Sequence, residues 1–151
     1  MSPCILVTGA TTPAGRSLLQ ALDGSCVTLL ACDSDPDAIS ALDEVRPEHR
    51  FLVQPSDSPE FVGEIVTLCV REHVDVLVPM CERDQLALAR MPRLFEQLGS
   101  RLWLAPIPAQ STHSQARRIV QLGHRPRSMH FVGAWLRRIA GQPAVAWSQR
   151  P

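Results

Sequence analysis

The sequence of 151 residues contains no lysine, no asparagine and no tyrosine, so all 15 of its positive charges are arginines. The chain therefore cannot supply a lysine phosphate clamp, a Schiff-base lysine or a tyrosine general acid. Apolar residues make up 45% of the chain and charged residues 20%, which is typical of a globular protein with a core. This length and composition predict one domain of ordinary size.

Long apolar runs are also missing, and we expect no membrane-spanning segment because such a segment needs about 18 consecutive apolar residues. The N-terminus has neither a basic region nor a small-residue cleavage site, so no signal peptide is expected and the predicted location is cytoplasmic. No CxxC pair occurs and the histidines lack ligand-like spacing, so no metal site is expected. We expect reduced thiols at all the cysteines, which are Cys4, Cys26, Cys32, Cys69 and Cys81.

Acidic residues are missing from the C-terminal part of the chain. All 15 lie within residues 1–110, whereas residues 111–151 contain seven arginines and no acid. Such an abrupt change in charge predicts a boundary. We expect a domain over 1–110 and a basic tail over 111–151 that is poorly ordered or partly helical.

Short apolar runs rich in β-branched residues alternate with helical patterns over the first 108 residues. This alternation indicates βαβ units, and it predicts an α/β fold with a Rossmann-like five-stranded parallel sheet covered by helices on both faces. Two helices are expected to open at proline, one at Asp35-Pro36 and one at Ser58-Pro59, with the residue before each proline as the cap. Pro92 is expected to kink or split a later helix. The expected strands cover residues 4–8, 27–32, 50–53, 74–78 and 102–104.

Residues 9–15 (GATTPAG) lie between the first expected strand and a helix, where backbone amides can face an anion. Gly9, Thr11, Thr12 and Gly15 are therefore candidates for contact with a nucleotide phosphate, and the alternative is that the glycines only shape a tight turn. Thr12 stands where a dinucleotide fingerprint needs its second glycine, and Pro13 lacks an amide. We therefore expect no tight binding of NAD.

Three side chains at the expected carboxyl edge of the sheet could contact a ligand. Asp33 lies 24 residues after Gly9, where an acid binds ribose in NAD-binding folds, or else it caps the next helix together with Asp35. Cys81 and Glu82 follow the fourth strand and are candidates for substrate contact, with a simple helix N-terminal charge as the alternative for Glu82. No histidine lies near Cys81 in the sequence, so no catalytic residue is assigned.

Four ordered segments carry a resemblance to a known family, namely residues 4–9 (CILVTG), 31–36 (ACDSDP), 58–62 (SPEFV) and 72–79 (EHVDVLVP). Residues 3–110 resemble the N-terminal pre-ATP-grasp domain of carbamoyl-phosphate-synthase-like ATP-grasp ligases. The resemblance implies a domain on the substrate side of an ATP- and Mg-dependent carboxylate–amine ligase, with a small carboxylate as substrate.

The sequence departs from that family at residues 111–118, where the family has a helix with an Asp-Lys pair. The expected function is therefore that of an isolated domain, or a remnant with a frame-shifted tail. Such a domain is non-catalytic alone, has no tightly bound cofactor and could form a homodimer. Two alternatives stay open. The first is an NAD(P)- or nucleotide-binding Rossmann protein, for which the absence of a Tyr-x-x-x-Lys pair excludes short-chain-type hydride chemistry. The second is a nucleic-acid-binding module that uses the arginine-rich tail with Trp135 and Trp147.

Overall fold

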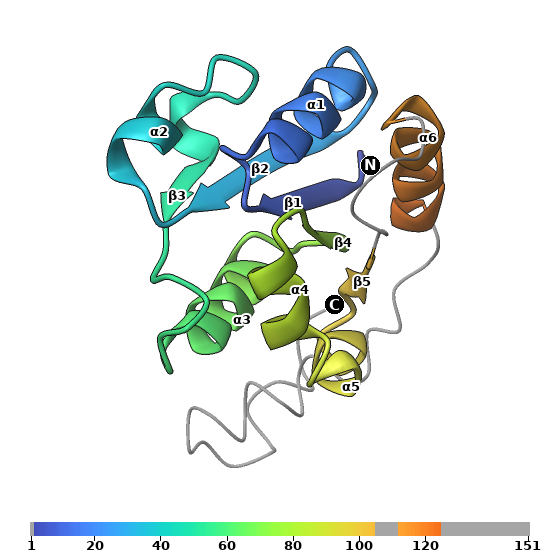
Figure 1. The fold of residues 1–151 in the computed structure, drawn as a ribbon. Helices are drawn as coiled ribbons and strands as arrows, with labels where there is room; N and C mark the ends of the chain where they lie inside the picture. The colour runs from blue at the N-terminus through green and yellow to red at the C-terminus, as the bar shows by residue number, and fades with distance from the viewer. Residues whose placement is uncertain (1, 105–111, 125–151) are drawn as a thin grey trace.

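The computed structural model describes residues 2–104 and 112–124. A single sheet of five strands, all parallel, has the order β3-β2-β1-β4-β5, which confirms the predicted Rossmann-like α/β fold (Figure 1). The strands are β1 (Cys4–Thr8), β2 (Thr28–Asp33), β3 (Arg50–Leu52), β4 (Val76–Pro79) and β5 (Arg101–Leu102).

Helices cover both faces of the sheet, as Figure 1 shows. They are α1 (Pro13–Leu22), α2 (Pro36–Ser40), α3 (Phe61–Arg71), α4 (Glu82–Leu88), α5 (Pro92–Gln97) and α6 (Thr112–Gly123), with a short 3-10 helix at Pro47–His49. Alternate residues of β1 point to opposite faces. Ile5 and Val7 pack against α1, α2 and α6, whereas Leu6 packs against α3, α4 and α5. Every residue of β1 is buried, so the central strand anchors both halves of the core.

Three helix features were predicted from prolines, namely a cap at Asp35, a cap at Ser58 and the interruption at Pro92, and two of them are confirmed. Asp35 caps α2, because its Oδ1 accepts hydrogen bonds from the amides of Asp37 and Ala38 at 3.0 Å. Pro92 splits the later helical stretch and becomes the first residue of α5. The prediction that Ser58 caps a helix is wrong, because α3 begins only at Phe61 and the Ser58 hydroxyl instead donates to the carboxylate of Glu60.

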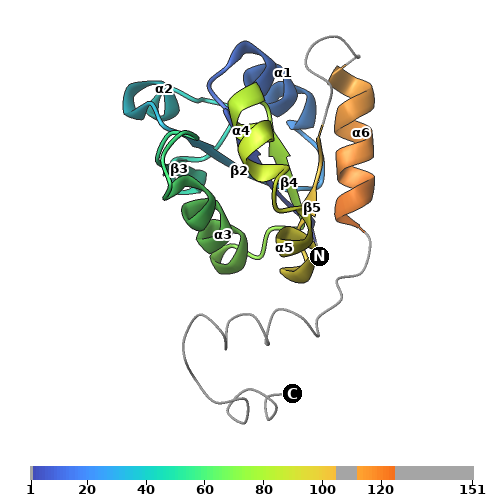
Figure 2. The same cartoon turned by 60° about the horizontal axis from the view of Figure 1, so that its bottom comes forward.

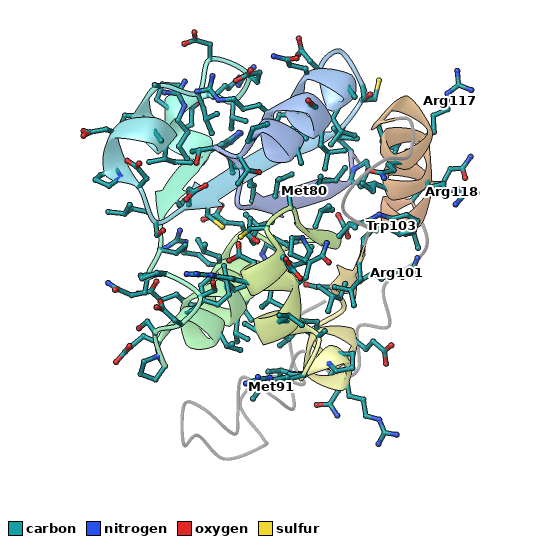
Figure 3. The ribbon with its side chains drawn as sticks, in the orientation of Figure 1. Met80, Met91, Arg101, Trp103, Arg117 and Arg118 are labelled. Atoms are coloured by element: carbon teal, nitrogen blue, oxygen red, sulfur yellow. The ribbon has the colours of Figure 1, made fainter. Side chains whose placement is uncertain are left out.

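Helix α6 lies within the region expected to be a basic tail. It packs beside α1 on the sheet, and its Ala116 and Ile119 are buried in the core (Figure 2). Arg117 and Arg118 are exposed and point away from the sheet, as the sticks in Figure 3 show. Residues 125–151, with Trp135 and Trp147, lie outside the described part of the chain. In the two described ranges, no helix is long and apolar enough to cross a membrane.

Candidate functional site

A cavity of about 230 Å³ opens at the carboxyl ends of β1, β2, β3 and β4. This is the edge at which open α/β sheets bind ligands, because the loops that follow the parallel strands meet there. Gly9, Thr11, Thr12, Asp33 and Cys81, all predicted from the sequence to contact a ligand, line this cavity together. The other lining residues are Ser34, Val53, Gln54, Pro55, Ser56, Asp57, Phe61, Arg83 and Asp84.

The turn between β1 and α1 is held by its two glycines. Gly9 has a φ of +59°, and a Cβ atom there would lie 2.8 Å from the Cβ of Cys81. Gly15 lies behind the turn, where a Cβ atom would lie 2.4 Å from the carbonyl oxygen of Gly9 and 2.8 Å from that of Ala10. Gly15 therefore allows close packing of α1 on the turn, and it does not line the cavity.

The backbone amides of this turn are engaged within the chain. Ala10 donates to the carbonyl of Cys32 at 3.4 Å, Thr11 to Asp33 Oδ2 at 3.0 Å and Thr12 to the carbonyl of Gly9 at 3.2 Å. The Thr12 hydroxyl accepts from the Gly15 amide at 3.1 Å and donates to the carbonyl of Gly9 at 2.7 Å. Thr12 is thus the N-cap of α1, and Pro13 follows it as the first helical residue. Most amides of the turn therefore donate to groups of the turn itself or of the end of β2, and the turn does not present a row of open amides.

Asp33 connects the end of β2 to this turn. Its Oδ2 accepts hydrogen bonds from the amide and the hydroxyl of Thr11, at 3.0 Å and 2.6 Å. Its Oδ1 accepts a third bond from the amide of Ser34 at 2.7 Å. A carboxylate offers about four acceptor positions, so Asp33 keeps capacity for one further donor on the cavity side. The capping role expected as its alternative belongs to Asp35 alone.

At the turn after β4, the side chains that face the cavity differ from those predicted from the sequence. Cys81 lines it, whereas Glu82, the first residue of α4, is exposed and does not. The cavity is instead lined by the next two residues, Arg83 and Asp84. The sequence predicts correctly that this turn lies at the carboxyl edge of the sheet. Because α4 begins inside the turn, the rotation of the helix about its axis decides which of its first side chains face the cavity.

Asp84 is the most buried carboxylate of the site, with 8% of its surface exposed. It accepts a hydrogen bond from the hydroxyl of the fully buried Thr8 at 2.7 Å. Burial raises the pKa of Asp84, the hydrogen bonds from Thr8 and Ser56 oppose this, and the nearby charge of Asp33 adds to the rise. The pKa of the Cys32 thiol is also well above its usual value, chiefly because of burial, so this thiol stays protonated at neutral pH.

A larger groove of about 680 Å³ lies between β3 and α3, on the outer side of the sheet. Its lining includes Arg50, Leu52 and Glu64, and Arg71 lies over the ring of Phe51 at 5.2 Å from the centroid. None of the ligand-contact residues predicted from the sequence lines it. The smaller cavity is therefore the better candidate site, because it combines the carboxyl edge of the sheet with converging polar groups. Among the described residues, no group of acids, histidines and cysteines could hold a metal ion.

Comparison with solved structures identifies Rossmann proteins. No protein-family model and no curated protein matches this chain by sequence. An oxidoreductase of the short-chain dehydrogenase/reductase family from Brucella ovis, solved with a partially ordered NAD, superimposes with a TM-score of 0.50 at 14% identity, covering 93% of this chain and 77% of that one.

Two further structures are similar at lower scores. A short-chain dehydrogenase from Streptomyces avermitilis gives a TM-score of 0.48 at 18% identity, covering 80% of this chain and 57% of its own. An epimerase from Methanothermobacter thermautotrophicus gives 0.45 at 14% identity, covering 94% and 49%. The chain therefore spans about half the length of these two proteins.

The Brucella ovis structure corrects the family expected from the sequence. It is an oxidoreductase of the short-chain dehydrogenase/reductase family and not an ATP-grasp ligase domain, so the pre-ATP-grasp resemblance and the ligase-domain function drawn from it are wrong. The physical reason is that three of the four segments describe parallel strands and the turns at their ends, and the fourth, residues 58–62, describes the start of a helix. Residues 4–9 and 72–79 include all of β1 and β4, which pair with each other near the centre of the sheet, and any Rossmann-like sheet needs such runs there.

Proposed function

We propose that this protein is a nucleotide-binding Rossmann domain and that the cavity holds the nucleoside part of the ligand. Asp33 is proposed to accept a hydrogen bond from a ribose hydroxyl. The supporting observation is that Asp33 is held at the end of β2 by Thr11 and Ser34 and faces a cavity at the carboxyl edge of the sheet. The structural neighbour from Brucella ovis was solved with NAD, which supports this class of ligand.

The cavity suits a nucleoside in size and lining. Its volume of about 230 Å³ is below the range of about 300–1,000 Å³ for pockets that enclose a drug-sized ligand, so it accommodates a part of a dinucleotide. The exposed Pro55 provides apolar surface for a base, with the buried Val53 and Phe61 behind it, while Asp33 and Ser56 provide polar groups for a sugar. The base is expected to lie near β3 and the ribose near β2.

The site matches only part of what binding of a whole dinucleotide requires. Gly9 and Gly15 serve the tight turn and the close helix packing that a dinucleotide fold requires. The Thr12 side chain stands where the pyrophosphate would approach the backbone, and the amides around it are engaged. The proposal is for binding alone, since the sequence has neither the tyrosine nor the lysine of short-chain-type hydride transfer.

Isothermal titration calorimetry with adenosine, AMP and NAD tests this proposal. We expect binding by the wild-type chain, and a loss of about tenfold in adenosine affinity in Asp33→Ala, because a hydrogen bond to a charged acceptor is worth about 1.5–3 kcal/mol. Asp43→Ala is the matched control, since Asp43 is exposed and does not line the cavity. The proposal fails if none of the three ligands binds at millimolar concentration, or if the two variants bind adenosine equally well.

We also propose a cytoplasmic location. Cys26 is exposed, Cys81 is partly exposed and neither forms a disulfide. Thiols in this state persist in a reducing compartment. Fractionation of the producing cell would test this, and recovery of the chain with Cys26 oxidised outside the cytoplasm would contradict it.

A further inference from the structure

We propose that Arg83 is the phosphate-binding residue of this site and that the ligand class is a nucleoside with one phosphate unit next to its ribose. This inference rests on the proposed function and adds to it the group that recognises the phosphate. It transfers that role from the turn after β1, which serves phosphates in dinucleotide folds, to the turn after β4.

The first turn is poorly equipped for this role. The amides of residues 10, 11, 12 and 15 already donate to acceptors within the chain, and Pro13 has none, so Ala14 is the one residue of this turn whose amide has no acceptor among the described residues. A phosphate would have to replace those bonds, including the cap of α1 and the bond that holds Asp33. Because each new bond except one to the Ala14 amide would first have to offset the loss of an existing bond, the amides of this turn add little affinity for an anion.

Arg83 has the opposite properties. It is the one basic residue in the lining of the cavity, and its side chain is exposed at its rim. Within the described residues, no hydrogen bond or ion pair engages its guanidinium. A guanidinium presents paired N–H groups that match two oxygens of a phosphate, so binding would form charge-assisted bonds without breaking existing ones. The structure therefore provides a cation beside a cavity of nucleoside size.

The acidic side chains of the cavity limit how much phosphate it accepts. Asp33, Asp57 and Asp84 share the lining with Arg83, so acids outnumber the cation by three to one. Additional phosphates would bring negative charge towards these carboxylates without a second cation in the lining to compensate. A single phosphate unit is therefore favoured over a triphosphate, and a ribose with free hydroxyls is favoured over one that carries a phosphate beside Asp33.

The test compares adenosine, AMP and ATP by calorimetry on the full chain. In the wild type we expect AMP to bind about tenfold more tightly than adenosine, as a charged hydrogen bond predicts, and ATP to bind more weakly than AMP. In Arg83→Ala the advantage of AMP should disappear while adenosine affinity stays unchanged. Arg93→Ala, an exposed arginine of α5 outside the cavity, should behave as the wild type. The AMP advantage should also decrease as salt is raised.

The outcomes separate the two proposals. If adenosine and AMP bind, and Arg83→Ala keeps the AMP advantage, the Arg83 inference is overturned and the nucleotide site stands. The Arg83 inference is likewise overturned if the wild type binds AMP no better than adenosine. If neither ligand binds the wild type, the nucleotide site and the Arg83 inference are both overturned. Thermal unfolding of Arg83→Ala shows whether the variant is folded, which its exposed position favours.

Discussion

Two turns face the same cavity and use their polar groups in opposite ways. The turn after β1 directs its amides and the Thr12 hydroxyl to acceptors and donors of its own chain. The turn after β4 leaves the Arg83 side chain at the rim of the cavity without a described partner. Both turns follow central parallel strands, so the fold alone does not explain the difference.

The contrast shows that the sheet topology determines where a ligand can bind, whereas the hydrogen bonds inside each turn determine which groups can bind it. The sheet brings four strand ends together, and this places the cavity. The bonding inside each turn then decides which groups are available to a ligand. In the first turn the Thr12 hydroxyl bonds to the Gly9 carbonyl and to the Gly15 amide, so this side chain occupies groups that a glycine would leave open.

The largest effect is expected from breaking the closed turn at Gly15. In Gly15→Ala the new Cβ would lie 2.4 Å and 2.8 Å from two backbone carbonyl oxygens, so α1 must shift. We expect the free energy of unfolding to fall by about 2–3 kcal/mol, as for other overpacked sites, in urea denaturation.

Gly63→Ala is the matched control for this change. Gly63 lies in α3 and a Cβ atom there would meet nothing within 4 Å. This substitution should raise the free energy of unfolding by about 0.5–1 kcal/mol, because alanine is the better helix former. Equal effects of the two glycine substitutions would contradict the close packing of α1 on the turn.

The next largest effect concerns the bonds between the end of β2 and the first turn. Asp33→Ala removes the acceptor of the Thr11 amide and hydroxyl and leaves both donors without it. We expect a loss of about 1–2 kcal/mol in the free energy of unfolding, reduced from the full value because the site is only partly buried. Asp43→Ala should change it by less than about 0.5 kcal/mol, as is usual for exposed positions. A stability of Asp33→Ala within that same range would show that Thr11 rehydrates without cost.

A pH-dependent effect is expected on the β4 side, at Asp84. Its pKa is raised in the folded chain, so the native state holds the proton more tightly than the unfolded state does. The contribution of Asp84 to stability therefore falls as pH rises from about 4, the ordinary aspartate value, through the raised pKa.

Asp84→Asn removes this titration while its amide oxygen can still accept the bond from the Thr8 hydroxyl. The variant should gain in stability relative to the wild type between pH 4 and neutral pH, measured by urea denaturation at both ends. Parallel pH profiles of the two proteins would contradict a raised pKa for Asp84.

Thr12→Gly should have the smallest effect on stability, and it tests most directly the contrast between the turns after β1 and β4. A glycine N-cap costs only a few tenths of a kcal/mol, so the chain should stay folded. Removal of the hydroxyl frees the Gly15 amide and opens the approach to the backbone. We expect NAD affinity to rise about threefold relative to adenosine, because the amides at the helix start become available to a pyrophosphate. Thr12→Ser keeps a hydroxyl and should show no such gain, and an equal response of both variants would exclude this explanation.

Much of the fold could be predicted from local patterns. The run 4–8 matches β1 residue for residue, and Pro92 divides two helices as its missing amide requires. The start of α3 could not be predicted, because Ser58 and Glu60 bond to each other and delay the helix to Phe61. The family was also predicted wrongly, since strand runs and capped turns report local structure and recur in unrelated Rossmann-like domains.

The candidate site was predictable in place but not in composition. Asp33 and the residues of the first turn do line the cavity, since their positions follow from the strand ends. The inward orientation of Asp84 depends on its bond to Thr8, a residue 76 positions earlier in the chain. No pattern within a few residues reports such a contact. Arg83 was missed for a different reason, because α4 begins inside the turn and its rotation about its axis decides which of its first residues line the cavity.

The attachment of β5 and α6 to the rest of the sheet affects how the protein unfolds locally. Strand β5 has only two residues, and Arg101 reaches from it to the carbonyl of Leu122 in α6 at 2.8 Å. Figure 3 shows Arg101 beside this helix. Strand and helix therefore detach together more easily than β1 leaves the centre. Amides of β5 and α6 should exchange with solvent through a partial opening, whereas those of β1 should exchange only when the whole sheet unfolds.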